Sequence, residues 1–160
     1  MVQFRLPKNS VVKNGINHKK DNHIEKALEL VERDKAYYCE CSSERLNKLR
    51  DDQEKKGQKP KYDGKCRNLS ISDSENTVIR FKNPEEGSVV FKDLIKGQIE
   101  FSNEEMDDFI IVRSDGAPTY NLCVVVDDLD MKISHVIRLD YHLNNTTKQI
   151  NVIDPQGIKK

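Results

Sequence analysis

Hydrophobic residues near the start of the chain recur at the spacing of an α-helix. Four of them occupy positions i, i+3, i+4 and i+7, namely Ile24, Ala27, Leu28 and Val31. Residues at these spacings share one helix face, so they predict a buried stripe. Asn22 is a favourable N-cap, and Glu25 follows three residues later, as in a capping box. The pattern predicts a helix from Asn22 to about Asp34, after a weakly patterned lead-in over residues 1–20 with a short strand near Val2–Leu6.

A second helix is predicted after the short aromatic segment of residues 37–41. Ser42 or Ser43 can cap its start, because a side-chain oxygen at this position accepts a hydrogen bond from the first turn. Gly57 is a suitable stop, since glycine readily adopts the left-handed conformation that ends many helices. The polar residues 59–76 contain proline, glycine, serine and asparagine and are predicted to form a loop.

Apolar and polar residues alternate from Thr77 onward, which is typical of β-strands. Short strands are expected around residues 79–82, 89–91, 99–101, 109–112 and 135–139. Residues 120–126 are ambiguous, because three consecutive valines favour a strand while a buried helix can also carry a continuous apolar run. A final helix, capped by Asn145 or Thr146, is expected to end near Ile153.

The composition fits one domain, or one domain with a small insertion. Apolar residues make up 36% of the 160 residues and charged residues 34%, and the 27 basic and 27 acidic residues cancel. Basic residues outnumber acidic ones between Arg45 and Arg67, which indicates either a solvated face or a surface for a phosphate backbone. No apolar stretch approaches the roughly 18 residues of a membrane helix, and the first residues lack a signal-peptide core. An intracellular location, in the cytoplasm, is therefore expected.

Three of the four cysteines could share a metal ion. Cys39 and Cys41 are one residue apart, and Cys66 follows 24 residues later, beyond a loop that can bring it back. Zinc prefers four tetrahedral ligands, so a fourth is needed, and Tyr62 is the candidate we favour. Three unlinked structural thiols are the alternative. Cys123 lies in an apolar run and is interpreted as a packed core thiol.

The segment from Arg113 to Ile150 resembles the signature stretch of glutamyl-tRNA synthetases, which are class I aminoacyl-tRNA synthetases. That family usually has a D-G-x-P-T-Y run, then an apolar V-V-D-D run, then H-V-I-R-G, two acids, a histidine and N-T-P. The matching residues here are Asp115, Gly116, Pro118, Thr119, Tyr120, Val126, Asp127, Asp128, His135, Val136, Ile137, Arg138, Asp140, His142, Asn145 and Thr146. Upstream, KALELVERDKAYYCECSSERL and KPKYDGKCR resemble the family's helix and zinc-binding insertion, so the resemblance covers about residues 19–150.

The resemblance implies a partial nucleotide-binding class I synthetase fold of the α/β class, with an inserted small antiparallel sheet and a zinc-binding loop region. The expected divisions are residues 1–20 as lead-in, 21–76 as the helical and zinc-binding region, 77–118 as the inserted β region and 119–160 as part of the catalytic fold. Some members pair three cysteines with a tyrosine, which favours zinc at Cys39, Cys41, Tyr62 and Cys66. The family also has a helix after the P-T-Y run, so the ambiguous residues 120–128 are expected to be helical.

The resemblance also implies glutamate–tRNA ligase activity by a monomer, in which ATP with Mg²⁺ activates glutamate and the acyl group then passes to tRNA. Tyr120 and Arg138 match family residues that contact glutamate, and an arginine fork suits a carboxylate. Asp140 and His142 fall in the region implied to contact ATP. The adjacent acids Asp127 and Asp128 are interpreted as structural or RNA-positioning residues rather than catalytic ones.

Several features depart from the family pattern. Leu139 stands where the family usually has glycine, Tyr141 where it often has a second acid, and Thr147 where proline is common. A leucine at position 139 would crowd a bound nucleotide. Neither an H-I-G-H-like nor a K-M-S-K-S-like motif occurs in the 160 residues. The leading hypothesis is therefore a truncated catalytic-domain fragment that does not form the adenylate alone. A non-catalytic tRNA-binding module is the alternative, and a shorter tRNA-modifying paralogue is disfavoured because it also needs the first motif.

Overall fold

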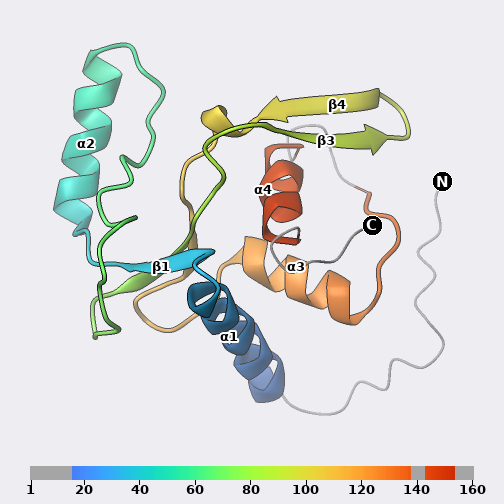
Figure 1. Cartoon of the computed structure of the whole chain (residues 1–160), viewed down its shortest axis with the longest axis horizontal. Helices are drawn as coiled ribbons and strands as arrows, with labels where there is room; N and C mark the ends of the chain where they lie inside the picture. The colour runs from blue at the N-terminus through green and yellow to red at the C-terminus, as the bar shows by residue number, and fades with distance from the viewer. Residues whose placement is uncertain (1–15, 138–142, 154–160) are drawn as a thin grey trace.

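The structure is a computed structural model that describes the backbone of residues 16–137 and 143–153 and the side chains of residues 21–137 and 144–153 (Figure 1). The described chain consists of helices and short strands. The elements are α1 (Ile16–Glu32), β1 (Ala36–Cys39), α2 (Ser43–Lys55), β2 (Val78–Phe81), β3 (Ser88–Asp93), β4 (Gly97–Ser102), a 3₁₀ turn (Asn103–Glu105), β5 (Ile110–Val112), α3 (Tyr120–Asp130) and α4 (Leu143–Ile153).

The larger sheet has three antiparallel strands in the order β1-β2-β5. Ala36 of β1 lies opposite Phe81 of β2, and Cys39 lies opposite Val78. Residues 40–77, which include α2 and a long loop, connect these two paired strands. The sheet therefore fixes both ends of that connection, and α2 projects from it on the far side from the other helices (Figure 1).

The second sheet is the hairpin of β3 and β4. Its turn is stabilised by Asp93, whose side chain accepts hydrogen bonds from the backbone N–H groups of Ile95 and Lys96, both at 2.8 Å. Gly97 closes the turn with a φ of 80°, a conformation that favours glycine. Leu94 and Ile95 are strongly exposed at the tip.

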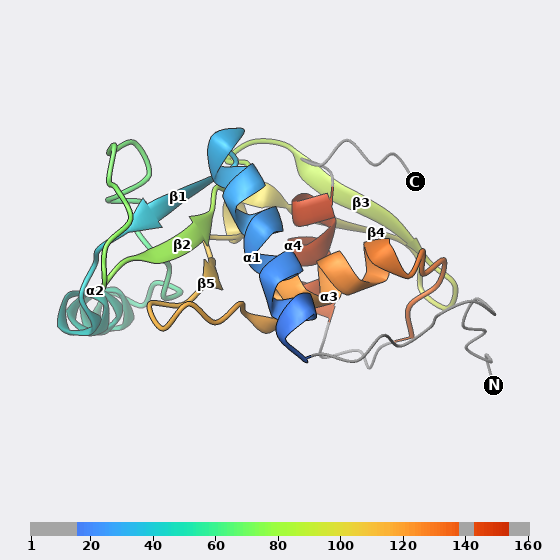
Figure 2. The ribbon, with the colours of Figure 1, turned by 90° about the horizontal axis from the view of Figure 1, so that it is seen from below.

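Three helices pack together beside the larger sheet. Figure 2 shows α1, α3 and α4 side by side, and both α1 and α3 contact the sheet. The core between them is apolar, and its largest fully buried side chains are Phe81, Leu30, Ile111, Leu122, Val125, Val126 and Val152. The predicted mixture of helices and small antiparallel sheets is confirmed.

Helix α1 differs from its prediction at both its start and its buried face. It begins at Ile16, so Asn22 lies inside the helix and is not its N-cap. The Asn22 side chain instead donates to Asp130 of α3 at 2.7 Å. Leu28 is 40% exposed, whereas Leu30 is buried beside Ala27. Contact with α3 and the sheet, rather than local spacing, therefore selects which apolar residues face the core.

Helix α2 follows its prediction closely. Ser42 is the N-cap, and its hydroxyl accepts a hydrogen bond from the backbone N–H of Arg45 at 3.3 Å. The helix ends at Lys55, and Gly57 follows with a φ of 67°. The expected loop over residues 59–76 is also present.

The last third of the chain confirms one helix and corrects two other expectations. Residues 120–130 form helix α3, as the family resemblance implied. Residues 133–137, by contrast, have no regular structure, so the strand predicted from His135 is wrong over its described part, and Leu139 lies outside the described residues. Neither sheet of the described chain offers these residues a partner. Helix α4 begins at Leu143, one turn or less before its predicted caps.

Among the described residues, no helix combines the length and the apolar character that crossing a membrane requires.

Candidate metal centre and substrate site

Local structure brings the three predicted cysteines to one point. Cys39 ends strand β1, and Cys41 immediately precedes the N-cap of α2. The loop after α2 returns past Cys39 and carries Tyr62 and Cys66. Gly64 lies between them with a φ of 68°, which turns the loop back on itself. This turn places Tyr62 and Cys66 close together. A residue with a side chain at position 64 would strain the turn.

The four side chains meet at short range. The Tyr62 hydroxyl lies 3.4 Å from the Cys39 sulfur and 3.5 Å from the Cys41 sulfur. The Cys41 and Cys66 sulfurs are also 3.5 Å apart, and all three sulfurs lie within 4.8 Å of one another. Cys39, Cys66 and Tyr62 are buried, while Cys41 is half-buried.

These distances fit a tetrahedral ligand set. Zinc–sulfur bonds of about 2.3 Å place tetrahedral sulfurs about 3.8 Å apart, and a sulfur and an oxygen about 3.5 Å apart. The Cys39, Cys41, Cys66 and Tyr62 atoms are close to that arrangement. Three thiols also suit zinc better than they suit a hard cation, which prefers oxygen. The donor atoms therefore fit a closed zinc site with no open position for substrate.

Burial and hydrogen bonding shift the pKa values of Cys41, Tyr62 and Cys39. Burial raises the pKa of the Cys41 thiol to about 11, and the neighbouring thiols add to that effect. Burial and hydrogen bonds to the cysteines likewise raise the pKa of Tyr62. Burial alone would raise the pKa of Cys39, but hydrogen bonds from Tyr62, the Cys41 backbone and Arg80 lower it overall. Four anions at this spacing need a dication, which would supply the charge that deprotonates the remaining ligands.

A buried carboxylate forms hydrogen bonds that hold the segments around the cysteine cluster in place. Asp108 is 5% exposed and accepts hydrogen bonds from the Tyr37 hydroxyl, the Arg67 guanidinium and the backbone N–H of Asn83. Arg67 directly follows Cys66. Burial and the hydrogen bond to Asp108 together raise the pKa of Tyr37, so the phenol remains a donor. Asp108 therefore fixes strand β1, which ends at Cys39, and the loop that carries Cys66.

Three buried asparagines continue this network to helix α4. The Asn151 side chain donates to the side-chain oxygens of Asn83, at 2.8 Å, and Asn103, at 2.9 Å. Asn103 in turn donates to the backbone oxygen of Glu86 at 2.8 Å. Buried amides need hydrogen-bond partners. These bonds therefore fix the position of α4 against the segment after β2, which contains Asn83, and the segment after β4, which contains Asn103.

The structure places only one of the predicted substrate residues. Tyr120 is the first residue of α3 and is 64% exposed, so the residue is accessible to a ligand. Arg138, Asp140 and His142 lie outside the described residues, as does Tyr141. The predicted pairing of Tyr120 with Arg138 therefore stays a prediction.

Comparison with known proteins gives the family. The family model described as tRNA synthetases class I (E and Q), catalytic domain, matches residues 14–160. The chain belongs to this family.

Two solved glutamate–tRNA ligases are similar to the chain. One, from Elizabethkingia meningosepticum in complex with its amino acid, has a TM-score of 0.80 and 25% identity over 96% of this chain and 34% of that one. The other, from Elizabethkingia anophelis, has a TM-score of 0.78 and 26% identity over 90% of this chain and 32% of that one. The present chain thus spans about a third of the length of each.

In this synthetase domain, Asp127 of the signature stretch takes part in helix packing. The Asp127 carboxylate lies 3.1 Å from Nε2 of buried His23 on α1, next to the contact between Asn22 and Asp130. These two contacts join α1 to the second half of α3, which agrees with the structural interpretation of Asp127. Cys123 is half-buried on α3 rather than fully packed in the core, and burial raises its pKa.

Two residues beside the cysteine cluster of this synthetase domain could not be recognised from the sequence. Arg80 alternates with Ile79 and Phe81 and so resembles a solvent-facing strand position, yet it is 5% exposed. Its Nε donates to the Cys39 sulfur at 3.3 Å. Asp108 lies at the end of an acidic run that resembles a solvated surface. The burial and the contacts of Arg80 and Asp108 arise only when the loop of residues 56–77 folds over the sheet.

Proposed function

We propose that the chain is part of the catalytic domain of a glutamate–tRNA ligase, which activates glutamate with ATP and Mg²⁺ and then charges tRNA. The match of the catalytic-domain family to residues 14–160 carries this proposal. Two similar glutamate–tRNA ligases support glutamate rather than glutamine as the amino acid. The signature stretch, with Tyr120 at the exposed start of α3, adds a residue suited to substrate contact.

Glutamate has two carboxylates, so a selective site needs fixed donors for both. Arg138 is proposed to hold one carboxylate through its planar guanidinium, and Tyr120 to donate a directed hydrogen bond. Asp140 and His142 are proposed to lie near ATP. Class I activation depends mainly on positioning and on stabilising the charge that develops on phosphate, so none of these residues is assigned as a nucleophile.

Pyrophosphate exchange tests the amino-acid specificity. The protein that contains this chain is expected to exchange pyrophosphate into ATP with glutamate and not with glutamine. Changing Tyr120 to Phe should raise the KM for glutamate while leaving the KM for ATP unchanged, because only a hydroxyl is removed. Exchange that depends on glutamine alone would reject glutamate specificity. From the 160 residues by themselves no exchange is expected, because their sequence holds neither phosphate-binding motif of the family.

Zinc is proposed to bind Cys39, Cys41, Tyr62 and Cys66 as a structural ion. Their donor types and spacing support a closed four-ligand site, whose ion would hold the loop after α2 against β1. Metal analysis of the purified protein should give one zinc per chain. Changing Cys66 to Ser should remove it, whereas changing Cys123 to Ser on α3 should not. A purified protein without stoichiometric zinc would reject the site.

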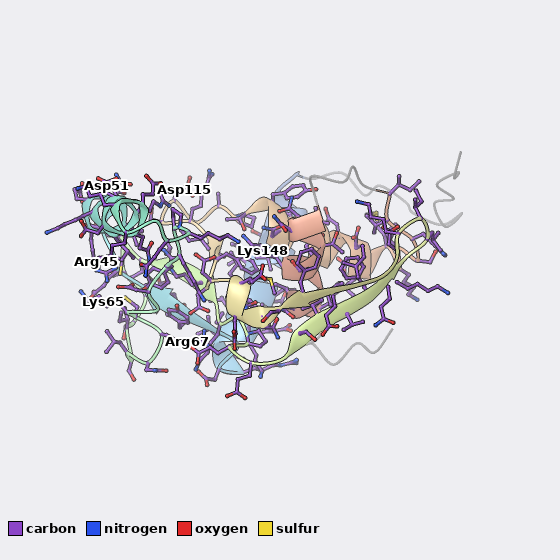
Figure 3. The ribbon with its side chains drawn as sticks, turned by 90° about the horizontal axis from the view of Figure 1, so that it is seen from above. Arg45, Asp51, Lys65, Arg67, Asp115 and Lys148 are labelled. Carbon is purple, nitrogen blue, oxygen red and sulfur yellow. The ribbon has the colours of Figure 1, made fainter. Side chains whose placement is uncertain are left out.

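A second candidate function is tRNA binding without catalysis. Seven basic residues of α2 and the following loop are exposed, namely Lys48, Arg50, Lys55, Lys56, Lys59, Lys61 and Lys65. Figure 3 shows Lys65 at the α2 end of the molecule, away from Lys148 of α4. A gel-shift with tRNA should weaken steeply as salt rises, because phosphate contacts release counterions. Binding that is absent or insensitive to salt would count against this function.

A further inference from the structure

Two arginines direct their charge at the cysteine cluster. Arg80 of β2 donates from Nε to the Cys39 sulfur at 3.3 Å. Arg45 of α2 donates from Nη1 to the Cys41 sulfur at 3.5 Å. The two guanidinium groups come from different elements and reach different sulfurs.

Charge explains why a zinc site of this composition needs such partners. Three thiolates and one phenolate carry two more negative charges than a zinc ion neutralises. Excess charge in a mostly buried site is costly, because little water remains to solvate it. Two guanidinium groups supply the missing charge, and they keep it at every physiological pH.

Each arginine is held in place by a further contact. The Arg80 guanidinium lies 3.8 Å from the centre of the Tyr62 ring and also donates to the backbone oxygen of Asp108 at 2.8 Å. Arg80 thus touches two of the four ligands and is itself buried. Arg45 is half-buried and also pairs with Asp63, which takes part of its charge. The stronger influence on the site therefore belongs to Arg80.

We propose that Arg45 and Arg80 are charge-balancing partners of the Cys39, Cys41, Tyr62 and Cys66 site and determine how tightly it holds zinc. This inference rests on the zinc site proposed above. Groups that contact metal ligands typically change metal affinity by about 10-fold to 100-fold when removed. The asymmetry of the two arginines places Arg80 near the upper value and Arg45 near the lower one.

Zinc affinity of charge-removing variants tests the proposal. Competition with a chromophoric zinc chelator should show about 100-fold weaker binding for Arg80→Gln and about 10-fold weaker binding for Arg45→Gln. Arg80→Lys should recover part of the lost zinc affinity, because lysine restores the positive charge but not the planar guanidinium group. Arg33→Gln is the matched control, since Arg33 is an exposed arginine beyond the end of α1 and should bind zinc as the wild type does.

The melting temperature of the zinc-free proteins separates charge balance from folding. A purely structural role would lower that temperature and leave the zinc affinity of the folded protein unchanged, and this result would overturn the proposal. If Arg80→Gln fails to fold, the less buried variant Arg45→Gln decides the outcome by its affinity. A wild-type protein that binds no zinc would overturn the underlying metal site as well. Wild-type binding with unaffected arginine variants would overturn only the role of the arginines.

Discussion

Replacing Asp108 by alanine should destabilise the protein more than any surface change in this region. The carboxylate is 5% exposed and accepts from Tyr37, at 2.5 Å, from Arg67, and from the backbone N–H of Asn83, at 2.9 Å. Its removal leaves the Arg67 charge, whose side chain is 15% exposed, without its buried partner. Breaking a buried ion pair from one side costs about 3 to 5 kcal/mol, and water entering the space would recover part of the other two bonds.

Urea unfolding followed by far-UV circular dichroism measures this loss. With a slope of about 2 kcal/mol per molar urea, a loss of about 4 kcal/mol lowers the midpoint by about 2 M. Glu85→Ala is a matched control, because Glu85 lies 3.4 Å from the same Arg67 but its side chain is 76% exposed. That exposed pair should contribute less than about 1 kcal/mol. Equal midpoints for the two variants would refute the assignment of Asp108 as the buried anchor of this region.

Three further substitutions test the packing and the caps. Phe81→Ala should cost about 3 to 5 kcal/mol in urea unfolding, because the ring is fully buried in the core; a loss below about 1 kcal/mol would mean that the core is not packed as described. Ser42→Ala should cost about 1 kcal/mol by removing the cap of α2, and an unchanged midpoint would contradict that cap. Asn151→Ala leaves two buried amide oxygens without their donor and should cost about 2 kcal/mol, with faster hydrogen exchange in α4; unchanged exchange there would show that the asparagines do not position α4.

Local sequence signals predicted the structure correctly where contacts between neighbouring residues determine the backbone conformation. The cap at Ser42 and the stop at Gly57 correctly bounded helix α2, because both act through hydrogen bonds within a few residues. The C-x-C spacing, with a tyrosine and a third cysteine beyond a turn-rich loop, likewise identified the four side chains that the structure brings together.

Long-range packing explains what local signals missed. Asn22 has the chemistry of a cap, but the helix extends past it and the side chain bonds to Asp130 instead. His135, Val136 and Ile137 have strand propensity, yet β-pairing needs a neighbour that the described sheets do not provide. The burial of Arg80 depends on a cysteine and a tyrosine that lie far from it in the sequence. Nothing in the neighbours of Arg80 distinguishes it from a solvent-facing strand residue.

The arrangement of the cysteines also bears on the order in which the protein folds. Strand β1 pairs with β2 only after residues 40–77 have been looped out, and closing a long loop costs chain entropy. A metal that joins Cys39 and Cys41 to Cys66 would leave only residues 67–77 to close before the strands meet. By the logarithmic dependence of closure entropy on loop length, this lowers the barrier to pairing by about 1 kcal/mol. An early-bound ion would then act as a nucleation point for the sheet, and refolding would be several times slower in the presence of a chelator.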